Sequence, residues 1–152
     1  MEIVLVDEPF DGPVASGLIA EVQQEYVVRY GGPDETPVDA GEFGAERGGA
    51  FLVASAVGVP VGCVGLRRHD ATVAEIKRMY VRTAHRRAGV GRVLLRAAED
   101  RARALGYTRV LLETGERQPE AIALYIADGY WPVSGFGHYH GHQGSRAFAK
   151  DL

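Results

Sequence analysis

The stretch that most constrains the fold runs from residue 73 to residue 106, where a β-rich segment, a glycine turn and an amphipathic helix follow one another. The segment VAEIKRMYV at residues 73 to 81 is typical of a strand. The turn RRAGVGR occupies residues 86 to 92. From residue 90, apolar side chains recur at helical spacing opposite charged ones: Val90, Leu94, Ala97, Ala98 and Leu105 against Arg92, Arg96, Glu99 and Arg103. The pattern predicts a helix that packs one face on a sheet.

The rest of the chain supplies further strands and helices around this unit. Strands are predicted at residues 3–6, 50–57, 61–66, 109–114, 130–133 and 145–152, and helices at 13–30 and 119–128. The order predicts one mixed sheet with helices on its faces, an α/β (α+β) architecture in a single domain spanning residues 1–152. Residues 31–49, rich in glycine, proline and acids, look like a mobile connection that either shapes a binding site or is disordered.

Composition excludes several classes of protein. With 46% hydrophobic and 24% charged residues, the chain is neither disordered nor a membrane protein, and no window of 18 uncharged apolar residues occurs. The lone Cys63 cannot form an internal disulfide, which favours a reducing compartment and a small core residue over a nucleophile. The N-terminus lacks the basic start and long apolar run of a signal peptide. We therefore expect a cytoplasmic location.

Charge is segregated along the chain. Residues 1–66 carry two basic residues against eleven acids, whereas residues 67–109 carry twelve basic residues against four acids. This basic segment could face an anionic ligand or nucleic acid, or form the solvated face of a helix. We expect no nucleic-acid partner, because the arginines at 92, 96 and 103 fit a solvated helix face.

The turn at residues 86–92 has features that are typical of an anion-binding site. Glycines let the backbone approach a ligand, the first N–H groups of a helix are unpaired, and the helix dipole favours negative charge. The P-loop pattern GxxxxGK[ST] is absent, and GVGRVL lacks the third glycine of a dinucleotide motif. From these residues alone, a capping turn with solvated arginines remains an equal alternative.

The same residues resemble the GNAT superfamily of acetyl-CoA-dependent N-acetyltransferases. Arg86, Gly89 and Gly91 satisfy its R/Q-x-x-G-x-G/A signature, and the strand EIKRMYV is similar to the one that precedes this motif. Ala121 and Tyr125 match N-x-x-A-x-x-x-Y, although Gln118 stands where Asn is usual. The resemblance implies a mostly antiparallel sheet of six to seven strands with helices on both faces.

The resemblance also implies where acetyl-CoA binds. Residues 1–49 would form an acceptor-side region, and residues 73–128 an acetyl-CoA-binding core in which β-strand 73–81 splays from its neighbour. The cofactor-binding residues implied are Met79, Tyr80, Val81, Arg86, Arg87, Ala88, Gly89, Val90, Gly91, Arg92, Gln118 and Tyr125. No metal is expected.

Two residues match catalytic positions of the family. Glu75 matches the general base that would take a proton from the amine, and Tyr125 matches the donor to the departing thiolate. From the residues alone, Glu75 could instead be a structural carboxylate paired with Lys77 or Arg78, or could bind the acceptor without taking a proton. An aromatic such as Tyr125 on an amphipathic helix is more often a core residue, but the spacing of the matched motif favours the thiolate role.

The sequence indicates the residues that would contact the acceptor amine less clearly. Glu75, Tyr26, Tyr30, His138 and Tyr139 are candidate acceptor contacts, with His140 beside them. His138, His140 and His142 alternate, but the glycines around them favour a loop over a zinc site. The expected function is acetyl transfer from acetyl-CoA to a primary amine of a small molecule, lysine or N-terminus, by direct attack in a ternary complex. The alternative is a non-catalytic acyl-CoA-binding or sensing domain; a homodimer is possible.

Overall fold

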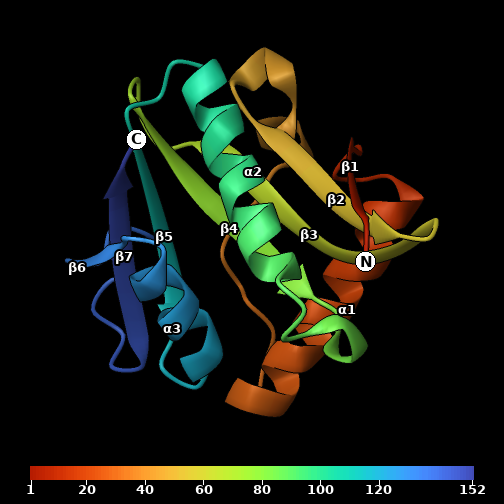
Figure 1. The fold of residues 1–152 in the computed structure, drawn as a ribbon. Coiled ribbons are helices and arrows are strands. Elements are labelled where there is room, and N and C mark those ends of the chain that lie inside the picture. The colour runs from red at the N-terminus through yellow and green to blue at the C-terminus, as the bar shows by residue number, and fades with distance from the viewer.

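Seven strands form a single sheet in the order β1-β2-β3-β4-β5-β7-β6 (Figure 1). The computed structural model describes residues 1–152. The strands are β1 (Ile3–Asp7), β2 (Ala50–Ala56), β3 (Val59–Arg68), β4 (Val73–Val81), β5 (Arg109–Gly115), β6 (Trp131–Val133) and β7 (Ser145–Asp151). Every neighbouring pair is antiparallel except β4 and β5, which run parallel. The predicted mixed, mostly antiparallel sheet is confirmed.

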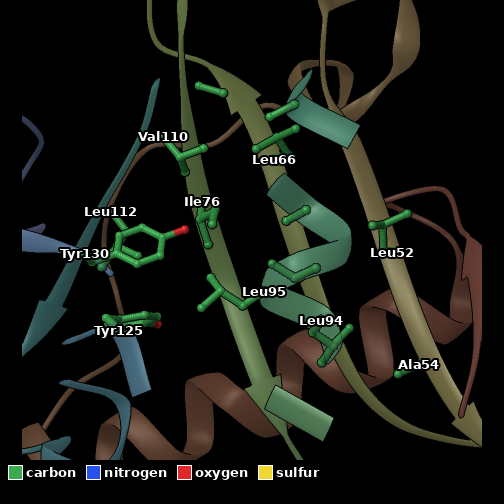
Figure 2. Packing of buried hydrophobic residues seen from close by; sticks show 14 of the residues in the cluster. Leu52, Ala54, Leu66, Ile76, Leu94, Leu95, Val110, Leu112, Tyr125 and Tyr130 are labelled. Carbon is green, nitrogen blue, oxygen red and sulfur yellow. The ribbon is translucent and has the colours of Figure 1, made fainter. Parts of the chain in front are cut away.

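Helices cover both faces of the sheet. Helix α1 (Pro13–Tyr30) packs on one face through Ala15, Leu18 and Val22. Helices α2 (Val90–Ala104) and α3 (Pro119–Ala127) pack on the other face, over the larger part of the core (Figures 1 and 2). Two cores result because strand side chains alternate between the faces. No helix combines the length and the apolar character needed to cross a membrane.

Strands β4 and β5 pair only at their beginnings. The parallel register joins residues 73–75 to residues 109–111 and then stops. Figure 1 shows the two strands diverging toward the end that carries α3. On the other side of β4, the pairing with β3 shifts, so that neither Arg78 nor Met79 has a partner residue. Arg78 adopts a φ of 57°, the left-handed conformation that a bulge can require. The expected splay is therefore present.

The buried face of α2 is wider than the sequence pattern predicts. Glu99, expected on the solvent face, is 2% exposed and accepts hydrogen bonds from the Tyr130 hydroxyl (2.8 Å) and the Lys150 Nζ (3.0 Å). Leu105, expected on the apolar stripe, is exposed because the helix ends at Ala104. Glu99 is buried because β7 and the segment before β6 approach α2 from the side.

The connection after α1 is packed against the sheet. It contains two 3-10 helices, Ala40–Phe43 and Ala45–Arg47, the first with a capping box in which the N–H of Asp39 donates to Glu42 (2.9 Å). Phe43 stacks on Phe10 at 4.4 Å between ring centroids. These contacts replace the mobile connection expected from composition, since buried aromatic area offsets the cost of ordering the glycines.

Candidate functional site

The turn before α2 has the geometry of an anion-binding site. Gly89 is the N-cap residue with a φ of 83°, and Arg87 has a φ of 63°. The backbone N–H groups of Val90, Gly91 and Arg92 donate to no acceptor in the protein. Nothing lies within 4 Å of the position that a Cβ on Gly89 would occupy. Unpaired donors at a helix N-terminus with open space before them suit a phosphate group.

Residue Gly91 lies where three elements converge. A Cβ there would be 3.2 Å from Leu124 of α3 and 3.6 Å from Met79 of β4, with Val81 close behind. A side chain here would press on Leu124, so glycine gives α2 room to begin beside both elements. The structure thus brings the expected residues Met79, Val81 and Gly91 together at the splay.

Most of the basic segment is neutralised by carboxylates. Of its twelve basic residues, all except Arg68 and Arg87 form an ion pair with a carboxylate. Arg86 pairs with Glu25 of α1, and Arg92 pairs with Asp128 (2.9 Å). Arg86 and Arg92 were both expected to face the cofactor through their side chains, but those guanidinium groups are already occupied. Arg87 is the free cation of the turn.

Tyr125 lies between the diverging strands. It is 6% exposed, and its ring packs 5.8 Å from that of Tyr130 and 6.2 Å from that of Phe148. Figure 2 shows the ring in the space between β5 and β4, with the hydroxyl turned toward β4. Burial raises the pKa of Tyr125, and no hydrogen bond within the protein engages its hydroxyl. Tyr125 therefore keeps its proton at neutral pH.

Gln118, the N-cap of α3, points toward α1. Its Oε1 accepts hydrogen bonds from the Tyr30 hydroxyl (3.1 Å) and the Thr114 hydroxyl (3.4 Å). A glutamine here reaches the end of α1, so this side chain belongs to the wall of a cavity on the α1 side.

That cavity, of about 340 Å³, is bounded by α1, the connection that follows it, β4, β5 and the loop before β7. Its lining residues are Tyr26, Tyr30, Gly32, Pro33, Asp34, Glu35, Lys77, Glu113, Thr114, Gly115, Gln118, Tyr139, His142, Gly144 and Ser145. Three residues expected at the acceptor site, Tyr26, Tyr30 and Tyr139, are among them. Lys77 of β4 and Glu113, Thr114 and Gly115 of β5 line the cavity beyond the point where the two strands cease to pair, so the cavity reaches the splay from the α1 side.

Glu113 of β5 is the functional candidate that the sequence did not reveal. Its Oε2 is buried without a hydrogen-bond partner, and the carboxylate lines the cavity. It alternates with the core residue Leu112, which places it on the α1 face of the sheet. The available signal was an acid near the end of the strand RVLLET, two residues before Gly115 and shortly before α3 begins.

Glu75 lies outside this cavity. Its carboxylate accepts a hydrogen bond from the Arg67 Nε (2.8 Å), and its side chain is 7% exposed. The Arg67 guanidinium also donates to the Pro37 carbonyl (3.0 Å). Glu75 therefore ties β4 to the connection after α1. This geometry matches the alternative of a structural carboxylate, although its partner is Arg67 and not Lys77 or Arg78.

Lys77 and Arg78 are both bound to Asp34. The Lys77 Nζ lies 2.9 Å from the Asp34 Oδ2 and 3.0 Å from the Thr36 hydroxyl, and the Arg78 guanidinium contacts the same Oδ2. Burial opposes ionisation of Asp34, but the two cations hold its pKa well below the usual range. The three charges anchor the connection over β4.

The three alternating histidines do not form a ligand cluster. His138 is exposed outside the cavity and packs edge-on against Tyr139, whose ring also contacts His142 at 5.3 Å between centroids. The chain has no group of three or more His, Cys, Asp or Glu residues that could hold a metal ion. His142 is the one histidine that faces the cavity.

Strands β4 and β5 diverge beside the N-terminus of α2, whose first N–H groups are free, and the cavity that contains Glu113 lies on the α1 side of this splay. This arrangement is that of the N-acetyltransferase fold class. The chain belongs to the acetyltransferase (GNAT) family, whose model matches residues 18–130.

Other acetyltransferases are similar to this chain in sequence or in structure. An IAA acetyltransferase of Azospirillum brasilense is 42% identical over 90 residues, covering 59% of each chain. The uncharacterized N-acetyltransferase YjgM of Escherichia coli K12 is 30% identical over 127 residues, 79% of this chain and 76% of that one. A GNAT structure from Elizabethkingia anophelis with acetyl-CoA bound superposes with a TM-score of 0.67 at 16% identity, covering 99% of this chain and 98% of that chain. The matched region spans less than two thirds of the Azospirillum protein.

Proposed function

We propose that this protein is an acetyl-CoA-dependent N-acetyltransferase that acetylates a primary amine by direct attack in a ternary complex. The observation that carries the proposal is the Glu113 Oε2, which is buried without a hydrogen-bond partner in a half-buried side chain that lines a cavity at the splay. A buried carboxylate without a partner is costly, and a cationic amine would compensate it. Membership of the family supports acetyl-CoA as the second substrate.

The two sides of the splay would bind different substrates. The α2 start, with its free N–H groups and Arg87, would hold the diphosphate, and the unpaired backbone around Met79 would lie beside the acyl arm. Residues 73–128 thus form the acetyl-CoA side. Tyr26, Tyr30 and Asp34 come from residues 1–49 and line the acceptor cavity, which supports the assignment of that region to the acceptor.

An amine that arrives as an ammonium loses two protons from nitrogen, one before attack and one as the amide forms, while one proton must reach the departing sulfur. Glu113 would accept the first proton, which frees the lone pair that attacks the thioester carbon, and would pass it to solvent. Tyr125, protonated at neutral pH, would donate a proton to sulfur as the C–S bond breaks, and the second proton lost by nitrogen would restore its hydroxyl. Glu113 takes the base role in this proposal because Glu75 is engaged by Arg67. A domain that only binds acyl-CoA would need neither group.

Replacing each candidate acid separately tests the proposal. Glu113→Gln should lower kcat/KM for the amine by roughly 10²- to 10⁴-fold, the usual contribution of a general base, and leave the Kd for acetyl-CoA unchanged. Glu116→Gln, an exposed partner of Arg146 on the same segment, is the matched control. Glu75→Gln should lower thermal stability and leave turnover near that of the wild type.

Full activity of Glu113→Gln would refute the base role. Turnover lost in Glu75→Gln without loss of stability would return that role to Glu75. Thermal unfolding with acetyl-CoA gives the first measurement, since a ligand at 100 times its Kd stabilises by about 2.7 kcal/mol. No shift at acetyl-CoA concentrations well above micromolar would contradict acetyl-CoA as the second substrate.

A further inference from the structure

Two hydrogen bonds tie opposite walls of the acceptor cavity to each other. The backbone N–H of Glu35, in the connection after α1, donates to the Tyr139 hydroxyl (2.8 Å) in the loop before β7. The Tyr30 hydroxyl at the end of α1 donates to Gln118 (3.1 Å) at the start of α3. All four residues line the cavity. The segments that would have to part to admit a bulky acceptor are therefore joined.

The second of these ties is reinforced outside the cavity. The Arg29 side chain donates to the Arg117 carbonyl (2.7 Å), the Arg117 side chain donates to the Arg29 carbonyl (2.9 Å), and Arg29 also pairs with Glu120 (2.5 Å). The end of α1 is thus fastened to the β5–α3 turn by several contacts. The loop of Tyr139 is held to the connection after α1 by the single hydrogen bond to Glu35, packs Phe136 edge-on against His69, and carries glycines at 135, 137, 141 and 144. The loop of Tyr139 is the side that can open.

The interior suits a compact cation. A volume of about 340 Å³ is at the lower end of the range for small-molecule sites. The rings of Tyr26, Tyr30 and Tyr139 contribute aromatic walls, and Asp34 is already neutralised by Lys77. Among the acids that line the cavity, Glu113 is the one with a buried oxygen and no ion pair, and aromatic faces favour a cation beside them.

Resting on the proposed function, we propose that the acceptor is a small free amine, with its ammonium at Glu113 and its carbon skeleton against the tyrosines, and that the Tyr139–Glu35 tie excludes polypeptide acceptors. Glu113 lies beneath the loop of Tyr139, because its carboxylate contacts the backbone at Gly137. A free amine fits inside the tied rim. A polypeptide leaves a main chain that must pass through the rim, so the tie has to break for each turnover.

A competition assay tests this inference. Wild-type protein with acetyl-CoA receives equal concentrations of free amines (alkyl, arylalkyl and polyamine) and a random-sequence peptide library with free N-termini and lysines. Mass spectrometry measures the acetylated fraction of each class. Free amines should react at least roughly 100-fold faster, within the range that a pocket's shape can discriminate. Peptides reacting as fast as the best free amine would overturn the inference.

Variants of Tyr139 test the hydrogen bond to Glu35 separately from the rest of the cavity. Tyr139→Phe keeps the ring and removes the hydrogen bond, and Tyr139→Ala removes both, so each should raise the ratio of peptide to free-amine acetylation by roughly tenfold or more. Ser134→Ala, exposed in the same loop and outside the cavity, should leave the ratio unchanged. An unchanged ratio in both Tyr139 variants would overturn the role of the tie. Acetylation of neither class by protein that binds acetyl-CoA would overturn the proposed function and this inference with it.

Discussion

The carboxylate of Glu113 lies directly against the backbone of Gly137: a Cβ on Gly137 would overlap the Glu113 Oε1. The two residues belong to β5 and to the loop before β7, so the position of the buried acid is set by a glycine far from it along the chain. Gly135 approaches the same carboxylate, with its Cβ position 3.5 Å from Oε2. The loop therefore acts as a close-fitting cover over the acid.

Gly137→Ala should displace Glu113 without removing it. Because a shift of about 1 Å at a reacting group can cost 10²-fold in rate, we expect kcat/KM for the amine to fall by roughly tenfold to a hundredfold. Gly144→Ala in the same loop is the control, since its Cβ would meet nothing closer than Glu116 at 4.0 Å. Steady-state kinetics check this; equal activity of the two variants would contradict a positioned Glu113.

Tyr125→Phe should lower kcat by about 100-fold, because the ring stays and the proton donor is lost. Acetyl-CoA affinity should stay within about twofold of the wild type, since the protein gives the hydroxyl no other partner. Tyr130→Phe is the matched control: it leaves Glu99 without one of its donors and should lower the melting temperature and spare kcat. Normal turnover by Tyr125→Phe would remove this tyrosine from the mechanism.

Arg87→Ala should weaken acetyl-CoA binding by about tenfold, the effect of losing one charge-assisted phosphate contact of roughly 1.4 kcal/mol. Arg103→Ala removes an equal charge from α2, where Arg103 pairs with Asp100 on the exposed face, and should leave the Kd unchanged. Titration calorimetry at low and high salt measures both. An identical Kd for the two variants would show that Arg87 does not face the phosphates.

Asp34→Asn should make stability less dependent on pH. The pKa of Asp34 is lowered in the folded state, so its contribution is complete above the unfolded pKa near 3.9 and is lost as the pH falls through the folded pKa. At pH 7 the variant should be less stable by roughly 3 kcal/mol, because Lys77 and Arg78 lose their shared partner. Urea unfolding from pH 7 to pH 3 should show the gap narrowing below about pH 4; a constant gap would contradict the assignment.

The conformation of the proposed cofactor side of the site was largely readable from the sequence because its signals are local. Gly89 and Gly91 indicate a turn followed by the N-terminus of a helix. Their backbone conformations depend on residues within one helical turn. The positions of Met79 and Val81 follow from the strand just before them. The partners of Arg86 and Arg92 were not readable, since Glu25 and Asp128 come from other elements.

The acceptor half was only partly readable because it is assembled from distant segments. Tyr26, Tyr30 and Tyr139 were predicted and line one cavity. Glu113 was missed and Glu75 was preferred, because a single acid in a strand gives no sign of whether an arginine will reach it. Arg67 neutralises one acid, and nothing in the protein neutralises the other.

The sequence by itself determined the order of strands and helices, the two faces of the sheet and the anion-binding turn, since periodicity and glycine placement act over a few residues. Tertiary structure alone decided which charges remain free. The acidic N-terminal third and the basic segment looked like separate surfaces, yet the fold pairs them, as with Glu21 and Arg82 or Asp7 and Arg101. That Arg87 on one side of the splay and Glu113 on the other have no ion pair depends on packing between elements far apart in the chain.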